Sequence, residues 1–300
     1  MFEQIDAALQ GNVKGMVIFG ANPVTSYPDV NRVEKAMKAL EFLLVMDIFP
    51  TPTTEFAHLV LPACSFAESD GTYSSSERRV QRVRPAIDPI PGKTNWEAIQ
   101  ELSTRMGLPM NYTCGEDIFN EMASLTPAFG GMTFDRLNEK GLCWPCPTSD
   151  HPGTQYLHKG RFSRGLGAFQ AIDYRPPAEL ADEEYPFQLT TGTIFTHYLT
   201  GTMTRRCRTL HHENPVVEVE INPEDAKRLD VENGDQVRAT SRRGSITASA
   251  FLTDRVKPGV VFIPLHYAEN PANRLTNPAL DPVTKTPEYK ACAVSLMKED

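Results

Sequence analysis

The fold of the first half of the chain is decided by two short apolar runs, GMVIF at residues 15–19 and FLLVM at residues 42–46. Continuous runs of this length are typical of strands that are buried on both faces of a sheet. Apolar residues at helical spacing predict an amphipathic helix over residues 28–41, and a third strand is expected at residues 58–61. This alternation of strands and helices predicts a parallel sheet with right-handed crossovers, and therefore an α/β domain.

The pattern changes to short alternating strands from residue 187 onward. One helix is expected at residues 223–229, where Asn222 is a good N-cap. The alternating pattern, interrupted by turn signals, predicts strands at residues 187–191, 217–221, 237–240, 247–252 and 260–263. Several short strands with a single helix predict a small closed β-barrel.

Three regions are therefore expected along the chain. Residues 1–126 form the α/β domain and include a helical stretch over residues 95–125. Residues 127–182 are rich in Pro and Gly and have few periodic stretches, which is typical of a linker or a lid with a functional role. Residues 183–300 form the barrel domain.

The composition excludes several classes of protein. The chain has 300 residues and a net charge of −8, which argues against a general nucleic-acid binder. It has no run of 18 apolar residues, so no membrane span is expected, and its first residues lack the pattern of a secretory signal. Six cysteines are too few for a disulfide framework and fit a reducing compartment, so we expect a cytoplasmic protein.

The usual metal and nucleophile motifs do not account for the chain. CWPC at residues 143–146 has no second cysteine pair at zinc-ligand spacing, and it lies in a Pro-rich stretch rather than at a helix start. No cluster of four cysteines suits an iron–sulfur site, and no hydrolase, zinc-protease or P-loop motif is present. We expect no catalytic residue and no metal ligand from this chain.

The densest group of chemically active residues is TGTIFTHYLTGTMTRR, residues 191–206. Backbone N–H groups of such a loop, with threonine hydroxyls and arginines, suit a pyrophosphate. Two other interpretations are a solvated hairpin loop and a docking face in which Arg205, Arg206 and Arg208 meet an acidic partner. In the first half, Asn22 and Asp47 follow predicted parallel strands, at the sheet edge where such folds bind ligands.

These motifs together resemble the molybdopterin oxidoreductases of the dimethyl-sulfoxide-reductase family. The loop at residues 191–206 is similar to a segment of that family, as are ESDGT at residues 68–72 and ERRVQ at residues 77–81. GLCWPCP at residues 141–147 is most similar to the catalytic (alpha) subunits of formate dehydrogenases, although periplasmic nitrate reductases share much of the pattern. The resemblance covers essentially the whole chain. It implies a partial parallel-sheet α/β domain followed by a small closed barrel of the double-psi type.

The resemblance also implies a cofactor and the residues that bind it. The cofactor would be bis-molybdopterin guanine dinucleotide with molybdenum or tungsten. Residues on the guanosine side would be Asn22, Asp47, Ser69 and Asn95, where Asn95 replaces the more frequent Asp. The Asp47 carboxylate suits the N1–H and N2–H₂ edge of guanine. The pterin and pyrophosphate would be bound by Thr191, Gly192, Thr193, His197, Thr200, Gly201, Arg205, Asn273 and Lys290.

The resemblance finally implies parts that this sequence does not contain. The iron–sulfur cluster and the protein ligand to the metal would belong to an N-terminal part of the catalytic subunit, and further subunits would transfer electrons. The chain is then a fragment or split subunit of an oxidoreductase that converts formate to CO₂ with release of two electrons, and it is expected to be inactive alone. Alternatives are part of a nitrate reductase-type enzyme, or a non-catalytic module that carries or assembles the cofactor. No nucleic-acid partner is expected.

Overall fold

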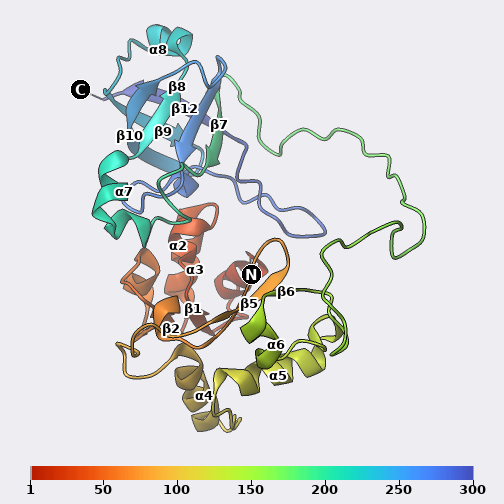
Figure 1. Cartoon of the computed structure of the whole chain (residues 1–300). Coiled ribbons are helices and arrows are strands. Elements are labelled where there is room, and N and C mark those ends of the chain that lie inside the picture. The colour runs from red at the N-terminus through yellow and green to blue at the C-terminus, as the bar shows by residue number, and fades with distance from the viewer. Residues whose placement is uncertain (1, 300) are drawn as a thin grey trace. The chain divides into compact units, whose positions relative to one another are not determined.

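The computed structural model describes residues 2–299 and contains two compact units. The first unit combines the chain up to Leu61 with the chain from Tyr174 onward, and the second unit spans Pro62–Asp173. The path of the chain through both can be followed by colour in Figure 1. The expected domain limits at residues 126 and 182 differ from the limits of these units and remain predictions.

The first unit begins with a three-stranded sheet of order β1-β2-β3. Strand β1 (Gly15–Phe19) pairs in parallel with β2 (Phe42–Asp47), with Gly15 opposite Phe42, and β3 (Leu59–Pro62) follows at the other side of β2. The parallel sheet that the apolar runs predict is thus confirmed. The run in β2 is buried from Leu43 to Met46, as expected for a strand covered on both faces. The expectation of full burial is wrong for β1, an edge strand in which only Ile18 is buried.

Helices cover one face of this sheet. Helix α3 (Val30–Ala39) packs with α1 (Phe2–Leu9) against Ile18, Leu43 and Val45 of the strands. The short helix α2 (Pro23–Ser26) and the 3₁₀ turn η1 (Pro52–Phe56) complete this part. On the strands, Val17, Phe19 and Phe42 keep 45%, 42% and 45% of their surface exposed. A parallel sheet normally has both faces covered, so this exposed apolar surface is unusual.

The second part of the first unit is a closed six-stranded barrel, which confirms the predicted barrel. Two of its pairings, β7 with β11 and β8 with β10, are parallel, and the other four are antiparallel. The order around the barrel is β10-β8-β11-β7-β12-β9. The strands are β7 (Phe187–Gly192), β8 (Glu218–Ile221), β9 (Gln236–Ser241), β10 (Gly244–Leu252), β11 (Val260–Pro264) and β12 (Cys292–Lys298).

Four short helical segments accompany the barrel. Helix α8 (Pro223–Leu229) begins after Asn222, whose side chain accepts the N–H of Glu224, as predicted for an N-cap. The others are η4 (Thr204–Arg206), α7 (Arg208–Glu213) and η5 (Ala272–Arg274). The barrel is filled by the inward side chains of all six strands, including Leu189, Val219 and Ile263. The α/β class with a parallel sheet and a closed barrel is therefore confirmed.

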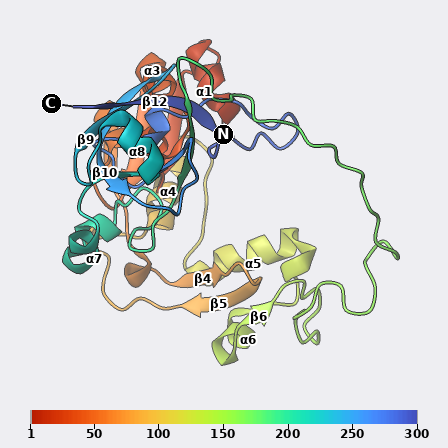
Figure 2. The ribbon, with the colours of Figure 1, turned by 90° about the horizontal axis from the view of Figure 1, so that it is seen from above.

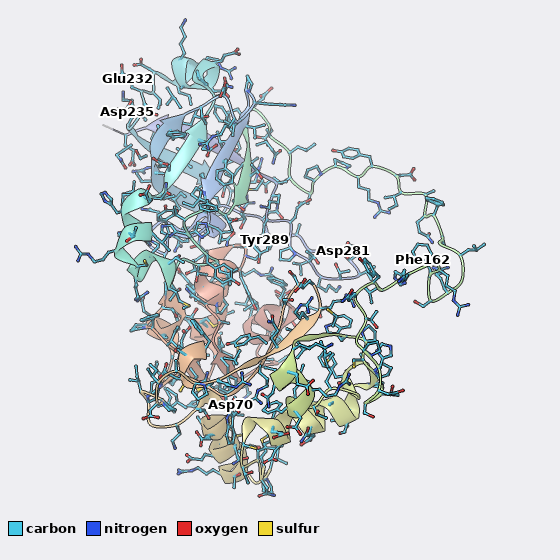
Figure 3. All side chains as sticks on the ribbon, in the orientation of Figure 1. Asp70, Phe162, Glu232, Asp235, Asp281 and Tyr289 are labelled. Atoms are coloured by element: carbon cyan, nitrogen blue, oxygen red, sulfur yellow. The ribbon has the colours of Figure 1, made fainter. Side chains whose placement is uncertain are left out.

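Hydrogen bonds join the barrel to the sheet part within the first unit. Tyr289, labelled in Figure 3, donates its hydroxyl to the carbonyl oxygen of Ser26 at 2.9 Å. Arg274 of η5 pairs with Glu34 of α3, with 2.9 Å between Nη2 and Oε1. These contacts fix the barrel beside helices α2 and α3.

The second unit contains a small antiparallel sheet and helices. Strands β4 (Gly71–Ser74) and β5 (Arg79–Val83) lie side by side in Figure 2, and β6 (Leu142–Cys143) pairs with β5. The helical stretch expected at residues 95–125 is two helices, separated by a loop that contains Gly107 and Pro109. The helical segments are η2 (Phe66–Glu68), α4 (Asn95–Arg105), α5 (Gly115–Leu125), η3 (Pro127–Phe129) and α6 (Phe134–Glu139).

The stretch that the sequence predicts to be a linker or lid is partly regular. It begins with η3, α6 and β6, which bury Phe134, Leu137 and Leu142 in the core of the second unit. After Cys143, the described residues form neither helix nor strand until Phe187, as the green run in Figure 1 shows. Among residues 2–299, no helix has both the length and the apolar character that a membrane crossing requires.

Candidate functional site

The carboxyl ends of β7 and β11 lie together, because these two strands are parallel neighbours in the barrel. Gly192 at the end of β7 is opposite Pro264 at the end of β11, and the N–H of Leu265 donates to the Gly192 carbonyl oxygen at 3.0 Å. Two loops leave the barrel at this point, at residues 192–206 and 265–277. The first of them, called the 192–206 loop below, contains most of the residues that the sequence predicts to bind the pterin and pyrophosphate.

Arg205 is held at the end of the 192–206 loop by partners on the second loop. Its two terminal nitrogens each lie 2.7 Å from a carboxylate oxygen of Glu269, and its guanidinium lies 4.7 Å from the ring centre of Tyr267. The backbone N–H of Arg205 also donates to the carbonyl oxygen of Gly201 at 2.9 Å. Gly201 has φ +70°, and a Cβ there would lie 2.7 Å from the carbonyl oxygen of His266. Only glycine therefore fits this close approach.

His197 is buried between the two loops. Its Nε2 lies 3.0 Å from the carbonyl oxygen of Asn214, and its ring packs edge-on against His266 and Tyr267. A carbonyl oxygen only accepts, so Nε2 carries a proton, and Nδ1 of the neutral ring is an acceptor. Within residues 2–299, His197 Nδ1 and Arg205 Nε are both buried without a hydrogen-bond partner. Buried polar atoms are rarely left unpaired, so these two point to a ligand that supplies one donor and one acceptor.

Residues 289 and 290 close the end of β7. Lys290 Nζ donates to the carbonyl oxygen of Thr191 at 2.6 Å, and Thr191 Oγ1 donates to that of Tyr289 at 2.8 Å. A Cβ at Gly192 would lie 2.8 Å from the Phe262 ring and 3.3 Å from Lys290 Nζ. The absent side chain at Gly192 thus lets the ammonium group approach the backbone where the loop begins.

The two remaining loop threonines are in different surroundings. Thr193 is exposed, and the Thr200 hydroxyl lies 2.8 Å from that of Thr202. Both hydroxyl groups belong to the same loop as His197 and Arg205, and their contact with a ligand stays a prediction.

On the sheet side, the Asn22 side chain is buried at the end of β1. Its Nδ2 donates to Thr25 Oγ1 at 3.0 Å, and its Oδ1 accepts from Thr53 Oγ1 at 2.7 Å. Asn273 of η5, also buried, donates from Nδ2 to the carbonyl oxygen of Thr25 at 2.9 Å. Asn22 and Asn273 therefore meet around Thr25, although one comes from the sheet and the other from the barrel.

Asp47 is half-buried at the end of β2. Burial raises the pKa of its carboxyl group, while the N–H groups of Ile48 and Phe49 and the charge of Arg206 act in the opposite direction. Ile48 N–H donates to Asp47 Oδ1 at 2.7 Å. Arg206, the last residue of the 192–206 loop, lies over the Phe49 ring at 4.4 Å. The structure thus brings the end of this loop to the end of β2.

Ser69 and Asn95 belong to the second unit. Ser69 is half-buried directly after η2. Asn95 forms a reciprocal pair with the backbone of Cys64, in which Oδ1 accepts from N at 2.6 Å and Nδ2 donates to O at 3.1 Å. The amide of Asn95 is therefore engaged with its own unit. The other predicted site residues all lie in the first unit.

Sequence reasoning missed the residues that hold the 192–206 loop in place. These are Asn214, His266, Tyr267 and Glu269, which lie 8 to 63 residues beyond the end of the loop. A usable signal was present, since polar and aromatic residues directly follow the apolar run at residues 260–264, at the end of a parallel strand.

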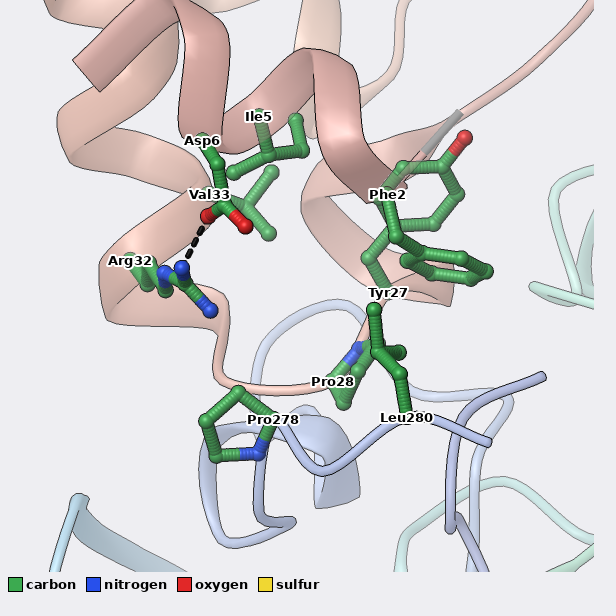
Figure 4. Close-up of a pocket in the computed structure, with 9 residues that line it drawn as sticks. All are labelled: Phe2, Ile5, Asp6, Tyr27, Pro28, Arg32, Val33, Pro278 and Leu280. Carbon is green, nitrogen blue, oxygen red and sulfur yellow. Dashed lines mark hydrogen bonds and ion pairs between the residues drawn. The ribbon is translucent and has the colours of Figure 1, made fainter. Parts of the chain in front are cut away.

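Two hollows lie away from this site. The one drawn in Figure 4 is lined by α1, α3 and the loop at residues 278–280, and its volume of about 20 Å³ admits little more than one water molecule. A larger open hollow of about 650 Å³ in the second unit is lined by Arg78 and residues 155–159. Within the described chain, no three His, Cys, Asp or Glu side chains gather as a metal site would require.

Comparisons with protein families match both parts of the first unit and the beginning of the second unit. Residues 1–105 match the model described as "Molybdopterin oxidoreductase", and residues 187–293 match the "Molydopterin dinucleotide binding domain". The second match contains strands β7 to β11, the first two residues of β12 and the 192–206 loop.

Individual relatives agree with these matches. The chain is 50% identical over 291 residues to the F420-dependent formate dehydrogenase subunit alpha of Methanocaldococcus jannaschii, covering 95% of this chain and 43% of the relative. It is 36% identical to the assimilatory nitrate reductase catalytic subunit of Bacillus subtilis, covering 99% of this chain and 44% of the relative. The chain thus spans less than half the length of these relatives.

A solved structure has the same fold at low sequence identity. Acetylene hydratase from Pelobacter acetylenicus superimposes with a TM-score of 0.76 and 16% identity, over 99% of this chain and 46% of that chain. This likeness shows the fold alone.

Proposed function

Because the chain belongs to the molybdopterin oxidoreductase family, we propose that it forms the cofactor-binding part of a formate dehydrogenase catalytic subunit. The cofactor would be bis-molybdopterin guanine dinucleotide with molybdenum or tungsten. When bound, it would take up the two electrons that are released when formate becomes CO₂ and a proton. The higher identity to a formate dehydrogenase than to a nitrate reductase favours formate as the substrate.

The observation that carries this proposal is the pair of buried, unpartnered atoms on the 192–206 loop. His197 Nδ1 is an acceptor and Arg205 Nε is a donor, and within residues 2–299 neither has a partner. Pterin rings offer N–H donors and phosphates offer acceptor oxygens, so one dinucleotide can satisfy both atoms. Backbone N–H groups and the hydroxyls of Thr193 and Thr200 would add contacts to the pyrophosphate. Thr191, Gly192, Gly201 and Lys290 shape the loop around these contacts.

Asp47 would select guanine. An ionised carboxylate only accepts hydrogen bonds, and the N1–H and N2–H₂ edge of guanine offers two donors side by side, whereas adenine offers no such pair. Burial raises the pKa of Asp47, while the N–H groups of Ile48 and Phe49 and the charge of Arg206 oppose this and favour the ionised form. Oδ1 already accepts from Ile48, so Oδ2 and the second lone pair of Oδ1 would meet the base.

The buried asparagines would act on the shape of the site. The Asn22 amide is engaged with Thr25 and Thr53, and the Asn273 amide is engaged with the Thr25 backbone. These bonds would hold the end of β1 and η5 at the spacing that the nucleotide and pterin need. Ser69 and Asn95 remain predicted residues of the guanosine side, and the Asn95 amide is already engaged with the backbone of Cys64.

The exposed apolar face of the sheet supports a further partner. Val17, Phe19 and Phe42 keep 45%, 42% and 45% of their surface exposed on a parallel sheet. We propose that an N-terminal part of the catalytic subunit, which supplies the iron–sulfur cluster and the metal ligand, covers them, and that further subunits transfer electrons. The chain alone would then be inactive. All six cysteines lie in the described chain and are free, in keeping with a proposed cytoplasmic location.

The test is native mass spectrometry of the protein from its host, with metal and nucleotide analysis and with assays of formate oxidation and nitrate reduction. The proposal predicts a complex larger than the 33.4 kDa chain, with molybdenum or tungsten, guanine nucleotide and formate activity. Nitrate activity without formate activity would refute the substrate. Formate turnover by the purified chain alone would refute its predicted inactivity, and a cofactor-loaded monomer without activity would identify a carrier.

A further inference from the structure

His266 is a fully buried histidine two residues after the end of β11, and both of its ring nitrogens contact the 192–206 loop. The N–H of Ile194 donates to Nε2 at 3.0 Å, and Nδ1 is paired with the carbonyl oxygen of Leu199. One ring therefore joins two points of the loop that are five residues apart. His197 lies between these two points, with its ring edge-on to that of His266 at 5.7 Å.

The two backbone partners determine the protonation of His266. The Ile194 N–H can only donate, so Nε2 must be an unprotonated acceptor, and the Leu199 carbonyl can only accept, so Nδ1 must carry the proton. The ring is thus neutral. Burial lowers its pKa, and nearby His197 and Arg205 lower it further, although the bond to the Leu199 carbonyl opposes this.

The loop that His266 contacts is locally strained. Leu199 has φ +46°, a left-handed conformation that residues with a side chain rarely adopt, and Gly201 two positions later has φ +70°. The carbonyl oxygen of His266 lies against Gly201, at 2.7 Å from where a Cβ would be. His266 therefore contacts the loop at Ile194, Leu199 and Gly201. Strained backbone persists only where the surrounding structure holds it, and such residues cluster at ligand-binding loops.

We propose that His266 is a positioning residue which, as the neutral Nδ1–H tautomer, holds the 192–206 loop in the conformation that presents His197 and Arg205 to the ligand. This inference rests on the proposed function, because that function supplies the ligand. His266 itself would not touch the ligand, since both of its nitrogens are engaged with the backbone. It would act by removing the need to order the loop on binding.

The test compares two variants of His266 with a matched control in the 300-residue chain. His266→Leu removes both ring bonds, whereas His266→Asn can keep a donor toward Leu199. The control is Asn222→Ala, since Asn222 is also a buried barrel residue with two backbone partners, at 2.9 and 3.0 Å, but it lies at the start of α8. GDP serves as the probe of binding.

Three measurements are made on each protein. Long-range ¹H–¹⁵N NMR identifies the tautomer of His266, amide hydrogen exchange follows residues 193–201, and calorimetry gives the affinity for GDP. We expect the Nδ1–H tautomer in the unaltered chain. In His266→Leu, loop exchange should be faster and GDP affinity weaker by about tenfold each, as expected for the loss of roughly one to two hydrogen bonds. In His266→Asn, the increase in loop exchange and the loss of GDP affinity should both be smaller than in His266→Leu. Asn222→Ala should leave loop exchange and GDP affinity unchanged.

The outcomes separate this inference from the proposed function. Loop exchange in His266→Leu no faster than in Asn222→Ala, or an Nε2–H tautomer, would overturn the role of His266. If the unaltered chain fails to bind GDP while loop exchange responds as expected, the role of His266 in holding the loop is supported and the proposed nucleotide ligand is refuted.

Discussion

Substitution of Gly201 by alanine tests the close packing of the 192–206 loop. The new Cβ would lie 2.7 Å from the His266 carbonyl oxygen and 2.9 and 3.0 Å from two carbons of the Arg205 side chain. The Arg205 side chain can move, although its bidentate pair with Glu269 opposes this, but the carbonyl oxygen is part of the backbone. The substitution therefore combines a conformational cost with a steric one.

The two costs can be estimated separately. An alanine at φ +70° costs about 1 to 2 kcal/mol relative to glycine because of its left-handed backbone. The overlap with a backbone atom adds about 1 to 3 kcal/mol, as is typical of an overpacked site. We therefore expect Gly201→Ala to reduce the free energy of unfolding of the first unit by about 2 to 5 kcal/mol, and to weaken GDP binding.

Gly234→Ala is the matched control for the steric cost. Gly234 has φ +92° in the same barrel, but no heavy atom lies within 4 Å of its Cβ position. It should therefore lose only the conformational part, about 1 to 2 kcal/mol. Urea unfolding followed by far-UV circular dichroism measures both variants. Trp96 and Trp144 both lie in the second unit, so tryptophan fluorescence provides an internal reference that neither substitution should shift.

Equal losses in the two variants would refute the close approach at Gly201. A shift of the tryptophan transition by Gly201→Ala alone would show that the substitution acts beyond the first unit, and would contradict a purely local steric effect.

Three further predictions concern buried polar groups of the first unit. Glu179→Gln should lower the free energy of unfolding of the first unit by about 2 to 4 kcal/mol in urea, because Arg243, 13% exposed, loses the charge of its bidentate partner. A loss below about 0.5 kcal/mol, as is typical of surface ion pairs, would contradict the importance of this pair. Asn273→Ala should lower the free energy of unfolding by about 1 to 3 kcal/mol, because the Thr25 carbonyl oxygen loses the Asn273 Nδ2 donor at 2.9 Å. An unchanged urea midpoint would refute this prediction. The pKa of His266 is lowered from 6.5 in the folded state, so its contribution to stability is complete above that pH and should decline as the pH falls from 6.5 toward the folded value. The stability of His266→Leu should vary less over this range, and identical pH profiles would contradict the assignment.

The sequence predicts the parts of the fold whose signals are local. The apolar runs at residues 15–19 and 42–46 pair in parallel, as their length and composition indicate. Strand β12 was not predicted, because residues 292–298 become a strand by pairing with β7 and β9, more than 50 residues away. The break between α4 and α5 was also missed, since apolar spacing continues through the loop that separates them.

The residue types of the site could be predicted, but their partners could not. The composition of residues 191–206 indicates a loop that binds anions, and this remains the most specific local signal in the chain. Whether an amide faces a ligand or the backbone depends on contacts across the fold. Asn95 pairs with Cys64 and Asn273 with Thr25, at separations of 31 and 248 residues, which no local pattern reveals.

The 192–206 loop combines strain with many fixed contacts, and this combination bears on its function. A left-handed Leu199 would be unfavourable in a free loop, yet both ring nitrogens of His266 and the Glu269 pair with Arg205 hold the loop on either side of it. Those contacts would be of little use to a loop that only connects two elements. In a binding loop, they lower the entropy that must be lost when the ligand arrives, and they keep the His197 acceptor and the Arg205 donor at a fixed spacing. The residues that confer affinity on such a site would therefore include some that never touch the ligand.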